Sequence, residues 1–359
     1  MSENVTWLER LETRFSRQWL GLHAARQTSV SRRNELEALF PDRKSPDSSL
    51  VVFGSLARQE VTGGSDLDWL LLVDGQSIPE HKEDETEIAK ILEDSKFIKP
   101  GRSGLFGSIV GSHDLIHNIG GEDDTNSNTT RRVLLLLEAL AIGNGAALGR
   151  VRKQILRRYL EDDRGLRHAG GDVRIPRFLL NDLTRYWRTV TVDFVYKQRL
   201  NRDGKWALRN AKLRMSRKLL YATGLLHCFF CHLDPDSKAV EARASLRLDT
   251  PEISPLVSWL EAQLELPPLD VLAKACLLFN AEPNTVNKIF DNYERFLGLL
   301  NDQDKRKELE TTSDPDAVRS SPAWAEVRSI SGPFHEALVS LFLKENPDLA
   351  TITMKYGIF

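Results

Sequence analysis

The stretch Ser49–Gly75, SLVVFGSLARQEVTGGSDLDWLLLVDG, constrains the fold more than any other part of this chain. A β-branched and apolar run ends at Gly54-Ser55, and a second apolar run follows over Asp66–Val73. Glycine and small polar residues interrupt such runs at turns and loops. The stretch therefore predicts a strand, a tight turn, a short helix over Leu56–Val61, a loop and a second strand.

Asp66 and Asp68 stand two residues apart at the start of the second predicted strand. Side chains two apart on a strand leave the same face, so these two carboxylates are expected to lie close together. Like charges at that separation disfavour each other unless a cation lies between them. Mg²⁺ binds proteins through one or two carboxylates together with substrate phosphates. The pair is therefore a candidate magnesium site.

Gly54-Ser55 marks the point at which the first predicted strand turns into the short helix. Glycine lets the backbone approach a ligand closely, and a helix N-terminus offers free N–H groups to a phosphate. The Ser55 hydroxyl adds one more donor. A phosphate site and a metal site on neighbouring strands together suit a nucleoside triphosphate, such as ATP, with its magnesium.

Gly54-Ser55, followed about ten residues later by Asp66-Leu67-Asp68 and an apolar strand, resembles the signature of the polymerase-β-like nucleotidyltransferase superfamily. Arg58 also matches a common variant of that signature. The resemblance implies that Gly54, Ser55 and secondarily Arg58 bind the triphosphate, and that the two aspartates hold two Mg²⁺ ions. It implies transfer of a nucleoside monophosphate to an acceptor hydroxyl, with release of pyrophosphate.

The superfamily also uses a third carboxylate on a later strand, which completes the metal site and activates the acceptor hydroxyl. Gly101–Gly121 alternates glycine and apolar residues and predicts one or two short strands. Asp114, within this segment, is the first candidate for the third carboxylate. Asp124 and Asp123, in the next predicted loop, are the alternatives.

In nucleotidyltransferases of this kind, an α-helical domain often sends a lysine or arginine and a serine to the triphosphate. Lys212 and Ser216 are the candidates here, because residues four apart share one face of a helix. Lys197 and Arg217 are further candidates. A triphosphate with Mg²⁺ keeps a net negative charge, so a cation opposite the metals would hold it in line. The competing interpretation is a solvated basic face.

The pattern as a whole predicts an α+β fold, in which a small mixed sheet with flanking helices precedes a mostly α-helical domain. The expected domains are an N-terminal helical segment at 1–45, a catalytic domain at 46–146 and the helical domain at 147–359. Predicted helices cover Glu3–Phe40, Glu80–Phe97, Arg131–Ile142, Ala147–Leu160, Pro176–Leu200, Trp206–Phe230, Ser254–Leu264, Val286–Leu300 and Pro333–Lys344. Asn301–Ser321 is polar and acid-rich and is predicted as a loop or frayed helix.

Composition narrows the class of protein. A formal net charge of -2 gives no overall basic field for nucleic acid, and 3 cysteines favour a reducing compartment over a disulfide framework. The Cys228-x-x-Cys231 pair has only Cys276 as a further thiol and lies in an apolar helical run, so buried thiols are expected rather than a zinc site. Neither a membrane span nor a secretory signal is evident, which predicts a cytoplasmic protein.

The sequence leaves the acceptor open. A protein side chain would match a resemblance to the bacterial uridylyltransferase of nitrogen signalling and its relatives, and a small molecule would match aminoglycoside nucleotidyltransferases. Both are favoured over RNA, because no basic stripe with interleaved aromatics is seen. A cyclic-oligonucleotide synthase of bacterial signalling or defence is an alternative within the superfamily. A non-catalytic nucleotide-binding module is the alternative from another class, and the third carboxylate distinguishes it.

Overall fold

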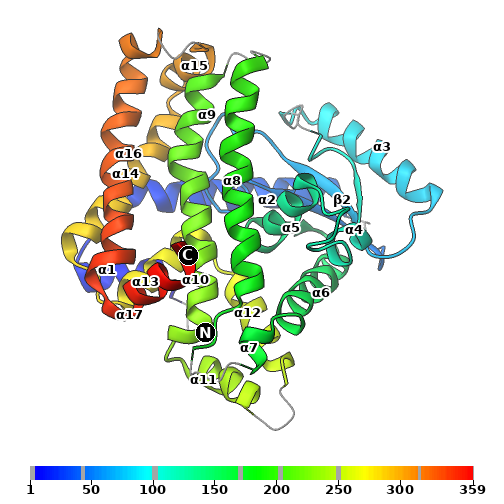
Figure 1. Ribbon diagram of the computed structural model, residues 1–359. Coiled ribbons are helices and arrows are strands. Elements are labelled where there is room, and N and C mark those ends of the chain that lie inside the picture. The colour runs from blue at the N-terminus through cyan, green and yellow to red at the C-terminus, as the bar shows by residue number, and fades with distance from the viewer. Residues whose placement is uncertain are drawn as a thin grey trace.

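The computed structural model describes residues 5–41, 45–98, 104–168, 173–200, 205–247, 252–313 and 317–358. A small sheet with flanking helices forms one side of the molecule, and a mostly helical region forms the other (Figure 1). The predicted α+β fold class is therefore confirmed. Residues 3–4, 101–103 and 314–316, which fall within predicted elements, lie outside the described part of the chain.

The sheet has four strands in the order β3-β2-β1-β4. The central strand β1 pairs antiparallel with both β2 and β4, whereas β2 pairs parallel with β3. The sheet is therefore mixed, as predicted. The strands are β1 (Ser48–Phe53), β2 (Trp69–Val73), β3 (Ile109–Gly111) and β4 (Ala139–Ile142).

Helices make up most of the rest of the described chain. They are α1 (Trp7–Phe15), α2 (Leu20–Leu39), α3 (Pro79–Asp94), α4 (Ser112–Ile116), α5 (Asn126–Leu137), α6 (Ala146–Glu161), α7 (Arg164–His168), α8 (Arg177–Leu200), α9 (Trp206–Lys212), α10 (Lys218–Leu233), α11 (Ser237–Ala244), α12 (Ser254–Leu264), α13 (Pro268–Leu278), α14 (Pro283–Asn301), α15 (Gln303–Thr311), α16 (Pro322–Ser340) and α17 (Pro347–Ile352). No helix among the described residues is long and apolar enough to cross a membrane.

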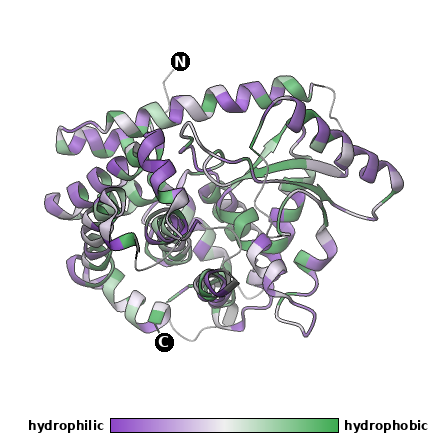
Figure 2. Cartoon of the chain, turned by 90° about the horizontal axis from the view of Figure 1, so that it is seen from above, coloured by the Kyte–Doolittle hydropathy of each residue, from purple (hydrophilic) through white to green (hydrophobic). Residues whose placement is uncertain are grey.

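The two faces of the sheet pack against different hydrophobic cores. On β1, Val51 and Phe53 belong to the large core shared with the helical region, whereas Leu50 and Val52 belong to a smaller core. The smaller core is completed by apolar residues of α2 and α3. Figure 2 shows the strands as a hydrophobic layer between helices with mixed faces. This alternation is what the period of two along a strand produces.

The same alternation places the two aspartates. Leu70 of β2 faces the large core and Trp69 faces the smaller one. The pairing extends one residue beyond β2, because the Phe53 amide donates to the Asp68 carbonyl at 2.9 Å. Asp68, one position before Trp69, therefore shares the face of Leu70. Since that face is covered by the helical region, Asp68 is aimed toward it.

The N-terminal segment forms two helices where the sequence predicted one. Ser16, at φ 48° and ψ 45°, adopts the left-handed conformation that ends α1, and α2 begins at Leu20. The apolar stripe continues across the break, so periodicity alone did not reveal it. From there α2 packs against both α14 and β4 and so joins the helical region to the sheet (Figure 1).

The predicted helix over Arg131–Ile142 is in fact a helix followed by a strand. Helix α5 ends at Leu137, Glu138 has φ -147° and ψ 49°, and β4 then begins at Ala139. An unbroken run of leucines suits a buried helix and a buried strand equally well, and no glycine or proline marks the change. This boundary matters because it places Glu138 directly before the first residue of β4.

The helical region departs from the predicted boundaries. The single helix predicted over Trp206–Phe230 is two helices, α9 and α10, joined by a π-helical turn over Leu213–Arg217. The span predicted as a loop or frayed helix over Asn301–Ser321 contains the helix α15. The last long helix, α16, begins before Pro333 and runs through it.

Candidate active site

The Gly54-Ser55 turn follows β1 directly. Gly54 has φ +71°, a backbone conformation that a side chain makes unfavourable. The Arg58 amide donates to the Gly54 carbonyl at 3.0 Å, and the Glu60 amide donates to the Ser55 carbonyl at 2.7 Å. The segment is a chain of hydrogen-bonded turns, not the regular short helix that the sequence predicted over Leu56–Val61.

The turn and the acid pair converge at one end of the sheet. A Cβ atom built on Gly54 would lie 3.7 Å from Asp68 Oδ2. The absence of a side chain at Gly54 therefore leaves the Asp68 carboxylate open toward the turn. Asp66 lies two residues before Asp68 on the same approach to β2, and 39% of its side chain is exposed. A ligand can thus reach the turn and both acids together.

The two carboxylates have different proton affinities. Burial and the neighbouring Asp66 raise the pKa of Asp68 to about 6. Burial also opposes ionisation of Asp66, but the nearby Lys212 ammonium outweighs it with help from a backbone hydrogen bond, so the pKa of Asp66 lies below its ordinary value. Arg217 and Lys212 oppose the rise in the pKa of Asp68 from a distance, and neither forms a direct ion pair with Asp68 in the described part of the chain. A half-buried carboxylate beside a second acid fits a divalent cation.

Lys212, predicted from the sequence, reaches the acid pair from the helical region. Its Nζ lies 3.6 Å from Asp66 Oδ1 at the end of α9. Burial lowers the pKa of Lys212, while Asp66 opposes that effect. About a third of the side chain, 32%, is exposed, so a phosphate can replace the carboxylate as its partner. Lys212 and the acids together line one site.

Ser216 is placed next to Lys212 but is turned along the helix. Its hydroxyl donates to the Lys212 carbonyl at 3.2 Å, and the residue is buried. The side chain of the other predicted lysine, Lys197, lies outside the described part of the structure.

Glu138 is a third acid at the same end of the sheet, and the sequence analysis missed it. Antiparallel pairing sets Ala139 opposite Phe53, so Glu138 lies beside the Gly54-Ser55 turn. Glu138 is buried, and its negative charge contributes to raising the pKa of Asp68. The signal that could have revealed it was an acid inside an otherwise apolar run.

Two arginines hold Glu138. Arg217 Nη1 donates to Glu138 Oε1 at 3.0 Å, and Arg58 Nη1 forms a short ion pair with Glu138 Oε2. Arg58 Nε also lies 2.9 Å from Glu60 Oε2. Arg58, assigned to phosphate binding by the resemblance, is thus buried between two glutamates. It supports the turn from beneath and does not point into the site.

Arg306 is a further cation near the acid pair that sequence reasoning missed. It crosses Gly64 so closely that a Cβ there would overlap its Nε, and it helps to lower the pKa of Asp66. Asn301 Oδ1 accepts a hydrogen bond from the Gly63 amide at 3.1 Å. Both residues lie in the span Asn301–Ser321, which the sequence predicted as a loop or frayed helix. Nothing in that pattern indicated that the span would contact the loop before Asp66.

Asp114, the first candidate for the third carboxylate, lies at the other end of the sheet. Because β3 runs parallel to β2 with Gly111 opposite Val73, α4 follows the end of β2 that is remote from Asp68. At about 3.3 Å per residue, the five steps from Asp68 to Val73 span roughly 16 Å. Asp114 is exposed and accepts a hydrogen bond from Asn118 at 3.3 Å.

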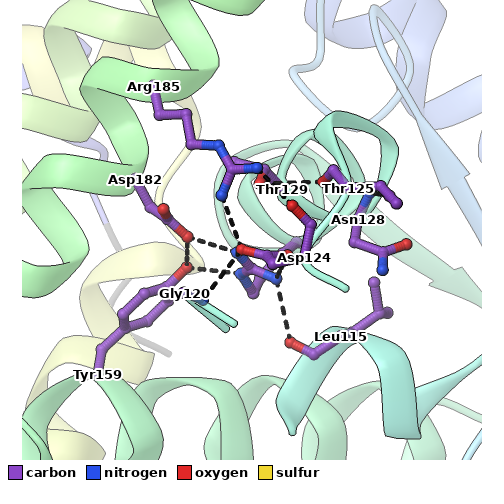
Figure 3. A network of polar contacts seen from close by, with 10 residues as sticks. Leu115, Gly120, Asp124, Thr125, Asn128, Thr129, Tyr159, Asp182 and Arg185 are labelled. Carbon is purple, nitrogen blue, oxygen red and sulfur yellow. Dashed lines mark hydrogen bonds and ion pairs between the residues drawn. The ribbon is translucent and has the colours of Figure 1, made fainter. Parts of the chain in front are cut away.

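Asp124, an alternative third carboxylate, belongs to a buried polar network (Figure 3). Arg132 donates to both of its oxygens at 3.1 and 3.0 Å, and Arg185 donates to Oδ2 at 2.8 Å. Burial opposes ionisation, but the Arg132 hydrogen bond and its neighbours hold the pKa of Asp124 below its ordinary value. Asp182 and Tyr159 complete the network and join α8 to α5 and α6. Asp123 is exposed.

Cys228, Cys231 and Cys276 are all buried as free thiols in the helical region. Burial raises the pKa of Cys231 to about 12, so its thiol stays protonated. Within the described residues, no group of three or more His, Cys, Asp or Glu side chains is arranged to hold a metal. Both oxygens of Glu138 are paired with arginines.

The arrangement combines an open glycine turn, a carboxylate pair and a lysine. These are the parts that phosphoryl and nucleotidyl transfer require, because catalysis there consists mostly of positioning and charge stabilisation. No curated protein matches this chain. Gly54, Ser55, Asp66 and Asp68 all lie within residues 33–110, and these residues match the family model of the nucleotidyltransferase domain.

Proposed function

We propose that this protein is a Mg²⁺-dependent nucleotidyltransferase, which moves a nucleoside monophosphate from a nucleoside triphosphate to an acceptor hydroxyl and releases pyrophosphate. The observation that carries the proposal is the convergence of Gly54, Asp68 and Lys212 from three separate segments. A Cβ atom at Gly54 would lie 3.7 Å from Asp68 Oδ2, and Lys212 Nζ lies 3.6 Å from Asp66 Oδ1. The match at residues 33–110 supports nucleotidyl transfer as the general activity.

Asp66 and Asp68 would hold Mg²⁺, which would neutralise phosphate charge when bound. The backbone amides after Gly54 and the Ser55 hydroxyl would hold phosphate oxygens. Lys212 would leave Asp66 for the triphosphate, since a metal supplies Asp66 with a replacement positive charge. These contacts would orient the α-phosphorus toward the acceptor, which is the main source of rate acceleration in such reactions.

In the reaction, the acceptor oxygen bonds to the α-phosphorus and the bond from that phosphorus to pyrophosphate breaks. The acceptor proton passes to the carboxylate cluster. Asp68 is proposed to take it, because its carboxylate is open toward the Gly54 turn, where the phosphates would lie. Glu138 is committed to Arg58 and Arg217, so it is proposed to position them.

We propose a protein side chain or a small molecule as the acceptor, in the cytoplasm. The test is to incubate the purified protein with Mg²⁺ and each α-labelled nucleoside triphosphate, alone and with cell lysate. Label on a protein or small product, lost in Asp66→Ala/Asp68→Ala, is expected. A nucleotide-only product formed without lysate would instead indicate oligonucleotide synthesis.

One observation favours a second candidate, a nucleotide-binding module without turnover. Glu138, directly before β4, lies at the same end of the sheet as Asp66 and Asp68. Ion pairs with Arg58 and Arg217 balance its charge. If those ion pairs persist when nucleotide binds, the site has two acids for a cation and no third. Binding of Mg²⁺ and a triphosphate with no label transfer under any condition would support this candidate over the enzyme.

A further inference from the structure

A pocket of about 240 Å³ lies between α2 and the loop that leads to Asp66. Its wall is rich in hydroxyl groups and contains one arginine. The residues of interest are Ser31 and Arg32 from α2, Ser55 from the turn, and Thr62, Ser65 and Asp66 from the loop. Hydroxyl donors around a cation are a chemistry that suits an anion.

The pocket shares two residues with the proposed active site. Ser55 and Asp66, the proposed ligands of the phosphates and the metal, both contribute to its wall, whereas Gly54 and Asp68 do not. A chain of phosphates that starts at the acid pair and passes Ser55 therefore leads toward α2. Lys212 and Arg217 approach the acids from the helical region and are not part of this wall.

Arg32 is held in an accessible pose. Its guanidinium carbon lies 4.2 Å from the centre of the Phe97 ring, and its Nη1 lies 2.8 Å from Glu35 Oε2. The Arg32 side chain is 40% exposed and that of Glu35 is 57% exposed. An exposed pair of this kind contributes at most about 1 kcal/mol, so it yields readily to a stronger anion. The ring fixes the plane of the guanidinium.

Arg32 supplies the positive charge of the pocket wall. Of the described residues that line the pocket, Arg32 is the only lysine or arginine, and Glu35 and Asp66 are the acids. Without a metal at Asp66, an anion that enters the pocket would meet a wall of net negative charge. The terminal phosphates of a metal-bound triphosphate escape this objection, because the metal neutralises Asp66.

We propose that this pocket holds the terminal phosphates of the nucleoside triphosphate and the pyrophosphate product, with Arg32 as their cation. This inference rests on the proposed function and adds the N-terminal helix α2 to the site. The fork of N–H donors on arginine matches phosphate oxygens in pairs, and the fixed guanidinium plane reduces the entropy lost on binding. The hydroxyls of Ser31 and Ser55 would supply further donors from opposite walls.

The test uses the full chain with Mg²⁺ and inorganic tripolyphosphate, which needs no knowledge of the base. Isothermal titration is compared for the wild type, Arg32→Ala and Arg32→Lys. Losing a charge-assisted hydrogen bond costs about 1.5–3 kcal/mol, so Arg32→Ala should weaken binding roughly 10- to 150-fold. Arg32→Lys should fall between, because it keeps the charge and loses the fork.

The matched control is Arg33→Ala, which removes an exposed arginine from the next position of α2, where it pairs with Glu37 at 2.8 Å. That variant should bind tripolyphosphate as the wild type does. Two results in Arg32→Ala would overturn the inference: unchanged affinity for tripolyphosphate, or a raised KM for the acceptor with normal tripolyphosphate affinity. In either case, label transfer by the wild type would leave the proposed function standing. If the wild type neither binds tripolyphosphate nor transfers label, the proposed function fails and this inference fails with it.

Discussion

Arg217 donates to Glu138 across 3.0 Å, and this ion pair joins the helical region to the end of the sheet at which Asp68 lies. Glu138 immediately precedes β4, and Arg217 ends the π-helical turn that follows Lys212. The ion pair therefore fixes the distance between the acids and Lys212, which directly precedes that turn. Arg58 holds the second oxygen of Glu138 and so fixes the Gly-Ser turn in the same arrangement.

Replacing Glu138 should separate its role in positioning from its role in folding. Glu138→Gln keeps the shape and loses the charge, so we expect kcat to fall about 100-fold or more with a small change in KM, as for loss of a preorganised charge. Glu138→Ala leaves two arginines without their partner and should lower the free energy of unfolding by about 3–5 kcal/mol. Steady-state kinetics and denaturant unfolding measure these effects. Normal kcat in Glu138→Gln would remove Glu138 from the mechanism.

Asp68→Asn should stabilise the metal-free protein while abolishing transfer. Burial and Asp66 raise the pKa of Asp68 to about 6, above its value in an unfolded chain, so the charged form is destabilising in the fold. The gain should be full above pH 6, should shrink as the pH falls toward 4, and should vanish below that, where Asp68 is protonated in both the folded and the unfolded chain. Thermal unfolding in EDTA across this range is the measurement. A lower Tm for Asp68→Asn at pH 8 would contradict the account.

Lys212→Met should weaken triphosphate binding and make Asp66 easier to protonate. Burial raises the pKa of Asp66, and Lys212 is the largest of the contributions that together hold it below its ordinary value, so that pKa should rise in the variant. We expect KM for the nucleotide to rise about 10-fold or more, from the loss of one charge-assisted contact. Arg214→Ala, an exposed position on the π-helical turn that follows Lys212, is the control. Equal KM values in the two variants would exclude Lys212 from phosphate binding.

Asp124→Asn tests whether that acid is structural. Its carboxylate receives two bonds from the fully buried Arg132, so the variant should lower the free energy of unfolding by about 3–5 kcal/mol. The protein that remains folded should transfer nucleotide at the wild-type rate, measured below its unfolding transition. An inactive variant with an unchanged Tm would return Asp124 to the active site.

Local chemistry in the sequence was sufficient to predict the first half of the site. Gly54, Asp66 and Asp68 lie within one strand-turn-strand unit, so short-range spacing determines their meeting. Lys212 was predicted by resemblance, and the structure brings it to Asp66. Glycine punctuation and strand alternation also indicated the α+β class, because those signals depend on neighbouring residues alone.

The second half of the site depends on long-range pairing and could not be predicted in this way. Glu138 was hidden in a leucine-rich run, in which the change from helix to strand has no local mark. Asp114 follows a real strand, but the parallel direction of β3 carries it to the far end of the sheet. Arg32 and Arg306 lie on helices whose packing, not their sequence, brings them to the pocket and the loop beside Asp66. Such contacts arise from the packing of distant segments.

The most direct test of the central claim is the rate of Mg²⁺-dependent pyrophosphate release in Asp68→Asn and Asp114→Asn, measured with the nucleotide and acceptor that the wild type uses. Both variants remove one carboxylate charge by an isosteric change, and only Asp68 lies against the Gly54 turn. We expect Asp68→Asn to be silent and Asp114→Asn to keep the wild-type rate. Activity lost in Asp114→Asn and kept in Asp68→Asn would show that the acid pair beside Gly54 is not the catalytic centre.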